Sequence, residues 1–128
     1  MGGKYNISHR KALEVLALNP WYIGIGRRKV LSVSIEPKLF YRGSFYAEPD
    51  LVFFMKRRVN RKLENFIPFS VIVIEYKSNG EERLIEKGET QLEKSVNYYN
   101  KIIKISAEGK LIIGNSYLIL LRKAILLF

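Results

Sequence analysis

The chain has 128 residues, and 22 lysines and arginines against 12 aspartates and glutamates give it a formal net charge of +10. Its length predicts a single domain over residues 1–128, and the absence of cysteine excludes disulfides, iron–sulfur clusters, thiolate metal sites and cysteine nucleophiles. The basic excess predicts a polyanionic partner, with nucleic acid favoured over an anionic membrane surface. A zinc site is disfavoured as well, because His9 is the only histidine.

Residues 6–18 predict the first helix. Ser8 is placed to accept a backbone hydrogen bond as its N-cap, and Ile7 is placed to pack onto Ala12. Glu14 is the only acid of this helix. Without further context it predicts a surface carboxylate paired with the basic residues one turn earlier.

The next segments predict a loop, a strand and an irregular region. Residues 21–28 predict a glycine-punctuated loop or short strand that ends in the basic pair Arg27 and Arg28. Residues 30–35 alternate apolar residues with serine, which predicts a half-buried strand. The inward side chains of this strand are expected to be Leu31, Val33 and Ile35. Residues 38–46 are aromatic and basic and predict a loop or irregular strand.

Two apolar strands with charged ends dominate the middle of the chain. Residues 50–55 and 69–77 predict antiparallel neighbours, and four consecutive β-branched residues in the second indicate burial on both faces. Asp50 opens the first strand, whereas Glu75 and Lys77 close the second on one shared face. Charges at the ends of buried strands are costly unless they are paired, bound to a metal or placed at a cleft. The three residues therefore predict a site.

The connection between these two strands is basic. Its lysines and arginines are Lys56, Arg57, Arg58, Arg61 and Lys62. Such a segment suits contacts with the phosphate backbone of DNA. The alternative is a solvated loop whose charges protect the edge of the sheet.

A second helix is predicted to begin with the capping box Thr90-Gln-Leu-Glu93. Gln91 then lies in its first turn, where the helix N-terminus favours a bound phosphate. The apolar stripe of this helix comprises Leu92, Val96, Tyr99 and Ile103. The adjacent, more polar face comprises Gln91, Ser95 and Tyr98.

The end of the chain predicts a strand and an apolar terminal element. Gly109 predicts a break, residues 111–113 a short strand, and residues 117–128 a helix or strand. This last run is too short for a transmembrane helix, and the polar N-terminus has no signal-peptide pattern. We therefore expect the protein to be cytoplasmic and to have no membrane partner. The cytoplasm in question includes that of an infected host cell. A monomer can hardly bury every face of residues 117–128, which predicts a homodimer; the alternative is a last core element.

The order helix, three strands, helix, strand predicts an α+β fold, or an α/β three-layer arrangement, with a small mixed sheet flanked by helices. Asp50 and Glu75 then lie at the ends of neighbouring strands. Their carboxylates, with the backbone carbonyl of Tyr76, are ligands of the kind that Mg²⁺ takes. Lys77 can orient an attacking water or stabilise developing negative charge.

The pair Pro49-Asp50, followed after 24 residues by Glu75-Tyr76-Lys77, resembles the signature of the PD-(D/E)XK nuclease superfamily. Gln91 and Tyr98 resemble the extra motif of its RecB-type branch, and Glu14 holds the place of the acid on the family's first helix. The resemblance implies a restriction-endonuclease-like αβββαβ core. Size and basicity are also similar to those of archaeal Holliday-junction resolvases and of small nucleases encoded by archaeal viruses.

The resemblance implies a DNA endonuclease of recombination, repair or replication that requires Mg²⁺ or Mn²⁺ and leaves 5′-phosphate and 3′-hydroxyl ends. Asp50 and Glu75 would bind the metal, Lys77 would assist the nucleophile, and Glu14 and Gln91 would complete the catalytic set. The residues expected to contact DNA are Arg27, Arg28, Arg57, Arg58, Arg61, Lys62 and Tyr98.

Other interpretations stay open. One is a non-catalytic nucleic-acid-binding protein on the same fold, and another is an assembly protein that uses the apolar C-terminal run. A purely structural interpretation makes Glu75 and Lys77 a salt bridge at the edge of the sheet, with Asp50 a turn residue after proline.

Overall fold

The computed structural model describes residues 8–56 and 68–114. In chain order its elements are α1 (His9–Leu18), 3₁₀ turns at Pro20–Ile23 and Arg27–Lys29, β1 (Val30–Ile35), β2 (Leu39–Tyr41), β3 (Ser44–Ala47), β4 (Leu51–Lys56), β5 (Pro68–Lys77), α2 (Glu82–Asn97), a π-helical turn (Tyr98–Ile103) and β6 (Ser106–Ile113). A mixed sheet has the order β1-β4-β5-β6, in which β5 and β6 are parallel and the other neighbours antiparallel. β2 and β3 form a separate antiparallel hairpin. The predicted α+β class is confirmed.

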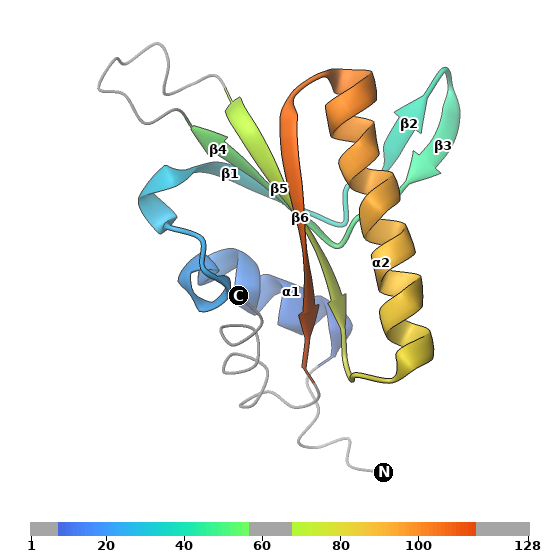
Figure 1. Cartoon of the computed structure of the whole chain (residues 1–128). Coiled ribbons are helices and arrows are strands. Elements are labelled where there is room, and N and C mark those ends of the chain that lie inside the picture. The colour runs from blue at the N-terminus through green and yellow to red at the C-terminus, as the bar shows by residue number, and fades with distance from the viewer. Residues whose placement is uncertain (1–7, 57–67, 115–128) are drawn as a thin grey trace.

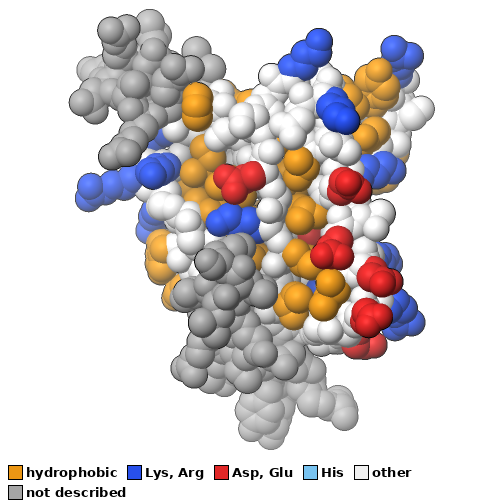
Figure 2. Space-filling model, in the orientation of Figure 1, with side chains coloured by type: hydrophobic (Ala, Val, Ile, Leu, Met, Phe, Trp, Pro, Cys, Tyr) orange, Lys and Arg blue, Asp and Glu red, His pale blue; other side chains and the backbone are white. Residues whose placement is uncertain are grey.

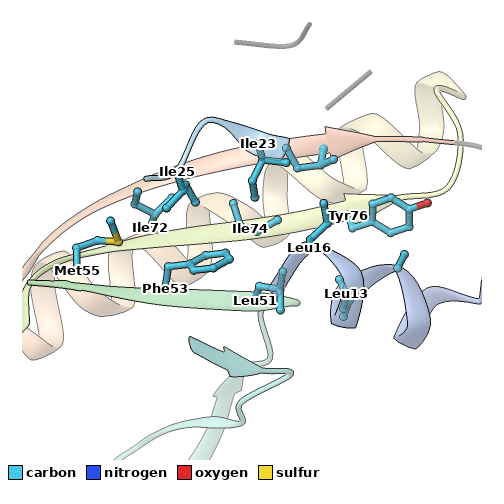
Figure 3. Packing of buried hydrophobic residues seen from close by; sticks show 12 residues of the cluster. Leu13, Leu16, Ile23, Ile25, Leu51, Phe53, Met55, Ile72, Ile74 and Tyr76 are labelled. Atoms are coloured by element: carbon cyan, nitrogen blue, oxygen red, sulfur yellow. The ribbon is translucent and has the colours of Figure 1, made fainter. Parts of the chain in front are cut away.

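The two helices cover opposite faces of the sheet, which gives three layers (Figure 1). Because side chains alternate along a strand, Phe53 and Ile74 pack with α1, as Figure 3 shows, whereas Val52 and Val73 pack in the cluster on the α2 face. β4 and β5 thus bury both of their faces, as the apolar runs predict. Asp50 directly precedes β4, and Glu75 lies near the end of β5.

The first half of the chain follows the prediction in outline. Ser8 caps α1, since its Oγ accepts the Lys11 N–H at 3.2 Å. The predicted staple residue Ile7 lies outside the described residues. The predicted loop at 21–28 contains the two 3₁₀ turns, and the predicted irregular region at 38–46 is the regular β2–β3 hairpin. Its turn residues Arg42 and Gly43 have φ values of 53° and 79°, the positive values of a two-residue hairpin turn.

β1 departs from the predicted alternation. Its register with β4 shifts between Val30 and Ser32, which marks a bulge. As a result Val30, Val33 and Ile35 pack against the α1-side core, and the prediction that Leu31 takes the first inward position is wrong. The extra residue of a bulge reverses the face of the residues before it, so alternation in the sequence alone misplaces them.

The second helix begins eight residues earlier than predicted. α2 starts at Glu82, so the predicted capping box at Thr90 is wrong, and the Thr90 hydroxyl instead donates to the Glu86 carbonyl at 3.0 Å. The predicted apolar stripe holds through Tyr99. Ile103 lies in the π-helical turn, which changes the number of residues per turn, and its side chain is 51% exposed.

The predicted break at Gly109 is wrong, because this glycine lies inside β6. A Cβ on Gly109 would lie 2.7 Å from Leu92 Cγ and 2.9 Å from Val96 Cγ2. The glycine therefore allows α2 to pack closely onto β6. Its role is close packing between the layers.

Two predicted features lie outside the described residues. These are the basic connection with Arg57, Arg58, Arg61 and Lys62, and the apolar run at 117–128. Within residues 8–56 and 68–114, no helix has the length and apolar character needed to cross a bilayer.

Candidate metal centre

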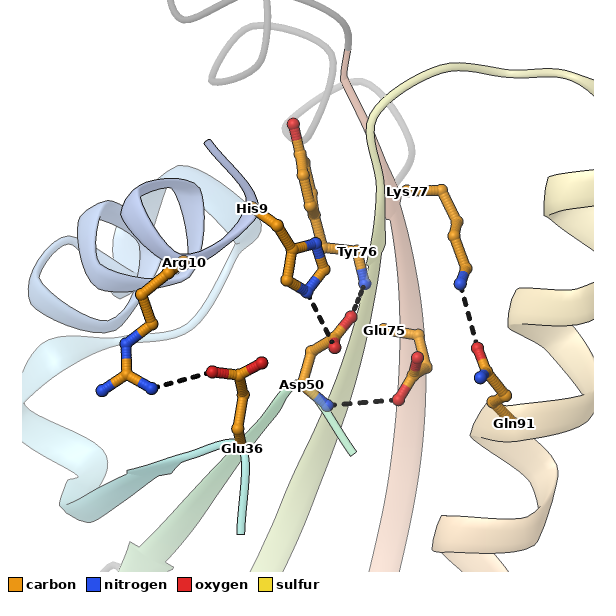
Figure 4. A network of polar contacts seen from close by, with 8 residues as sticks. All are labelled: His9, Arg10, Glu36, Asp50, Glu75, Tyr76, Lys77 and Gln91. Atoms are coloured by element: carbon orange, nitrogen blue, oxygen red, sulfur yellow. Dashed lines mark hydrogen bonds and ion pairs between the residues drawn. The ribbon is translucent and has the colours of Figure 1, made fainter. Parts of the chain in front are cut away.

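Asp50, Glu75 and Lys77 come together at one end of the sheet. The antiparallel register pairs Leu51 with Ile74, so Asp50 and Glu75 are the next residues on neighbouring strands. Asp50, Glu75 and Lys77 are each separated by an even number of positions from the valines of β4 and β5 that face α2. All three side chains therefore lie on that face of the sheet. Figure 4 shows the two carboxylates side by side with the Lys77 side chain beyond them.

The backbone fixes both acids. The Asp50 N–H donates to Glu75 Oε2 at 3.2 Å, and the Tyr76 N–H donates to Asp50 Oδ2 at 2.6 Å. Asp50 is 9% exposed and Glu75 is 2% exposed. Because each carboxylate is held by the backbone of the opposite strand, the pair forms part of the β4–β5 ladder and is not free to turn away.

The negative charge of this pair is poorly compensated. Burial, and next the charge of Asp50, raise the pKa of Glu75 to about 8, while the Asp50 N–H and Lys77 oppose the rise. Two buried carboxylates so close together favour either a shared proton or a bound cation. The cluster is therefore suited to a divalent metal ion.

Lys77 is directed away from the acids. Its Nζ donates to Gln91 Oε1 at 2.9 Å, and the ion pairs found among the described residues do not include Glu75 with Lys77. Gly88 makes room for the lysine stem, since a Cβ there would lie 3.1 Å from Lys77 Cε and 3.3 Å from Lys77 Cγ. The close approach to α2 turns the ammonium towards Gln91, so it opposes the rise in the pKa of Glu75 from a distance.

Gln91 reaches the site from the middle of α2 and not from its first turn. The prediction of a phosphate at the helix N-terminus beside Gln91 is therefore wrong. The first turn carries Glu82 instead, whose charge would repel an anion. Gln91 contacts the site through its hydrogen bond with the Lys77 ammonium.

Two residues of the site were missed in the sequence. His9 Nε2 lies 3.1 Å from Asp50 Oδ1, and ligand atoms of His9, Glu36 and Asp50 lie within 4.8 Å of one another. Glu36 directly follows β1, and its N–H donates to the Asp50 carbonyl at 2.8 Å. The available signal was an acid at the end of the strand next to β4, together with the chain's only histidine at the start of a helix.

Glu14 lies apart from this cluster. It accepts from Arg10 Nε at 3.5 Å, and Arg10 Nη1 also donates to Glu36 Oε1 at 2.8 Å. The residue of α1 that contacts Asp50 is His9. Among the described residues, Glu14 is linked to the acids only through Arg10 and Glu36.

The described residues predicted to contact DNA occupy different ends of the molecule. Arg27 and Arg28 precede β1, whose first residue pairs with Met55 near the end of β4. Asp50 lies at the opposite end of β4, and a rise of about 3.3 Å per residue puts it about 20 Å from these arginines. The hydroxyl of Tyr98 donates to the Phe40 carbonyl at 2.9 Å, so Tyr98 supports the β2–β3 hairpin. These two arginines and the acids therefore do not form one compact site.

The exposed side of α2 is acidic. Figure 2 shows red side chains gathering over this helix, and its exposed glutamates are Glu82, Glu86, Glu89 and Glu93. A polyanion would be repelled there. The helix also carries the exposed cations Arg83, Lys87 and Lys94, so these glutamates weaken its attraction for nucleic acid without making the whole helix repulsive.

Comparisons of the chain with protein-family models, with curated proteins and with solved structures give no match. The strongest part of the site's geometry is the pair of buried carboxylates beside Lys77.

Proposed function

We propose that the protein is a metal-dependent DNA nuclease of the PD-(D/E)XK type. The observation that carries the proposal is the placement of Asp50, Glu75 and Lys77 on one face at the end of β4 and β5. The two helices and the four-stranded sheet follow the αβββαβ order that the resemblance implies, with the β2–β3 hairpin inserted after β1. The net charge of +10 favours a nucleic acid as the substrate.

The donor set fits Mg²⁺ or Mn²⁺. Asp50 and Glu75 offer carboxylate oxygens; burial and next the charge of Asp50 raise the pKa of Glu75, and a bound cation would favour its ionised form. In a strand, the N–H and C=O of one residue lie on the same side. The Tyr76 N–H bonds Asp50, so the Tyr76 carbonyl is also directed to that side and can serve as a third ligand. When bound, the metal would polarise a phosphodiester and activate a water molecule.

The protein side chains would divide the remaining work. The Lys77 ammonium would stabilise charge that develops on the phosphate or orient the attacking water. Gln91 holds the ammonium through its Oε1 atom, and His9 would hold the Asp50 carboxylate in place. Glu36 offers a further oxygen near Asp50, but Arg10 already binds it at 2.8 Å. We therefore assign the metal to Asp50 and Glu75 rather than to the group of His9, Glu36 and Asp50.

The basic residues would supply backbone contacts. Arg57, Arg58, Arg61, Lys62, Arg27 and Arg28 are the proposed phosphate-binding residues. Their contribution would be independent of DNA sequence and would weaken with salt. The apolar residues 117–128 would join two copies in a homodimer.

A cleavage assay tests this function. End-labelled single strands, duplexes, flaps and four-way junctions are incubated with Mg²⁺ or with EDTA, and the product ends are analysed. We expect Mg²⁺-dependent products with 5′-phosphate and 3′-hydroxyl ends. Lys77→Met keeps the stem against α2 but removes the charge, so it should lower the rate by about 10²–10³-fold. A wild-type protein that binds DNA but cleaves none of these substrates would support the non-catalytic alternative.

Gly88→Ala tests the placement of Lys77. The new Cβ would meet the lysine stem and Leu111 Cδ1, the latter at 2.8 Å. We expect cleavage to fall about tenfold and stability to fall by about 2 kcal/mol at most, because strain of about 1–3 kcal/mol is partly offset by the about 1 kcal/mol gained when alanine replaces helical glycine. Gly80→Ala is the control, since its Cβ would lie 3.8 Å from the nearest side chain. Wild-type cleavage by Gly88→Ala, measured beside a thermal unfolding curve, would contradict this role.

A further inference from the structure

The β2–β3 hairpin exposes an aromatic pair that neither core uses. Phe40 and Phe45 are direct partners across the hairpin, so they share one face. They are 52% and 58% exposed, and their ring centroids lie 6.1 Å apart in an edge-to-face arrangement. Exposed aromatic surface of this kind marks a contact site for a ligand or partner.

The hairpin is anchored, so it can present these rings rigidly. Its base residues Leu39 and Ala47 are buried in the core on the α2 side. Tyr98, directly after α2, packs on Tyr46 with ring centroids 5.4 Å apart, and its hydroxyl donates a hydrogen bond to the Phe40 carbonyl. A rigid aromatic surface binds a flat ring at a lower entropic cost than a mobile loop does.

Two cations contact the tyrosines of the hairpin. The Arg42 guanidinium lies 5.1 Å from the Tyr41 ring, and Lys94 Nζ lies 5.2 Å from the Tyr46 ring. In Figure 2 orange and blue side chains occur together at the upper right, where Figure 1 places the hairpin. Because side chains alternate along a strand, Tyr41 and Tyr46 lie on the opposite face of the hairpin from Phe40 and Phe45. A hollow lined by both Phe45 and Lys94 links the two faces. A single nucleic-acid strand offers both ring faces and phosphates, so it can use the rings of one face and the cations of the other.

This hollow of about 220 Å³ lies beside the hairpin and reaches Gln91, the partner of Lys77. It lies between β3 and α2 and is lined in part by Phe45, Lys94 and Gln91. Gln91 also accepts the hydrogen bond of Lys77, so the hollow adjoins the proposed active site. Drug-sized ligands occupy pockets of about 300–1,000 Å³, whereas this smaller space suits one ring system. Glu48 in the lining disfavours a phosphate there and favours a base.

We infer that the hairpin is a stacking platform for unpaired nucleotides of a DNA strand that leads to the metal centre. The inference rests on the proposed nuclease function and specifies its substrate as DNA with a single-stranded segment. Bases of an intact duplex are already stacked on one another and cannot lie on Phe40 or Phe45. The cations Arg42 and Lys94 near the hairpin favour a nucleic acid over an apolar protein partner.

Binding in EDTA tests the platform separately from cleavage. A single-stranded oligonucleotide that carries 2-aminopurine is titrated with full-length protein, and a duplex of equal length serves as the comparison. Phe40→Ala and Phe45→Ala should each weaken single-strand binding at least tenfold and remove the quenching of 2-aminopurine, with duplex affinity within about twofold of wild type. Phe45→Trp should restore both signals. Leu18→Ala is the control for lost exposed apolar surface, since Leu18 is 69% exposed at the end of α1, and it should bind single strands as wild type does.

The outcomes separate the two proposals. Unchanged single-strand binding by Phe40→Ala and Phe45→Ala, in a protein that cleaves DNA, would overturn the platform and leave the nuclease function intact. An equal loss for single strand and duplex would also overturn it. Light scattering that shows a wild-type dimer turned into a monomer by these substitutions would assign the rings to self-association instead. A wild-type protein that binds no DNA would reject both proposals. Thermal unfolding of each variant confirms that it is folded.

Discussion

Asp50→Asn should abolish metal-dependent cleavage, with a loss of about 10³-fold or more, because the metal contributes several kcal/mol to the stabilisation of the transition state. Asparagine is the sharper replacement for this position. Its amide oxygen can still accept the Tyr76 N–H, which Asp50 Oδ2 now accepts at 2.6 Å, whereas alanine would leave that buried donor without a partner. DNA affinity in EDTA should fall little or even rise, since a negative charge is removed.

The control for Asp50→Asn is Glu108→Gln, which removes an exposed acid from β6. Glu108→Gln should cleave at the wild-type rate, and both variants should unfold at temperatures close to that of wild type. The measurement is the single-turnover cleavage rate of a labelled substrate at saturating Mg²⁺. Cleavage by Asp50→Asn within tenfold of wild type would remove Asp50 from the metal centre.

Glu75→Gln should make the metal-free protein more stable at high pH while it removes cleavage. The pKa of Glu75 is raised from 4.5 to about 8, so between these values the folded protein holds a proton that the unfolded chain has lost. This contribution to stability is fully present below pH 4.5 and is lost as pH rises towards 8, at no more than about 1.4 kcal/mol per pH unit. Glutamine has no proton to lose and can still accept the Asp50 N–H through its amide oxygen.

Urea unfolding in EDTA at pH 5 and pH 8 measures this effect. The wild-type protein should lose stability between the two pH values relative to Glu75→Gln, and Mg²⁺ at pH 8 should restore stability only to the wild type. Parallel stability curves for the two proteins would show that Glu75 does not titrate between pH 5 and 8. Retained cleavage by Glu75→Gln would exclude it as a metal ligand.

Strong local patterns made much of the site predictable. The β-branched run before Glu75 fixes a buried strand, and strict alternation then places Glu75 and Lys77 on one face. The apolar run after Asp50 predicts an antiparallel neighbour, so the two acids were expected near one another. These inferences need only the period of a strand, which the sequence displays directly.

The rest depends on contacts that are distant in sequence. The early start of α2 is an example, because the helix continues through Gly88, and glycine weakens helices. Glycine is needed at this position because Lys77 and Leu111 occupy the space that a side chain would take. The bulge in β1 is set by pairing with β4. His9 meets Asp50 across 41 residues of sequence, and neither residue alone signals the other.

The most direct measurement is a titration of the metal-free protein with Mn²⁺, with the free ion followed by electron paramagnetic resonance at pH 8. Assignment of the metal to Asp50 and Glu75 predicts saturable binding in the wild type that is lost in Asp50→Asn and in Glu75→Gln. Glu36→Gln is the matched comparison, because Glu36 belongs to the group of His9, Glu36 and Asp50 but not to the pair. It should bind Mn²⁺ nearly as wild type does. Binding that survives Glu75→Gln and is lost in Glu36→Gln would contradict the proposed centre.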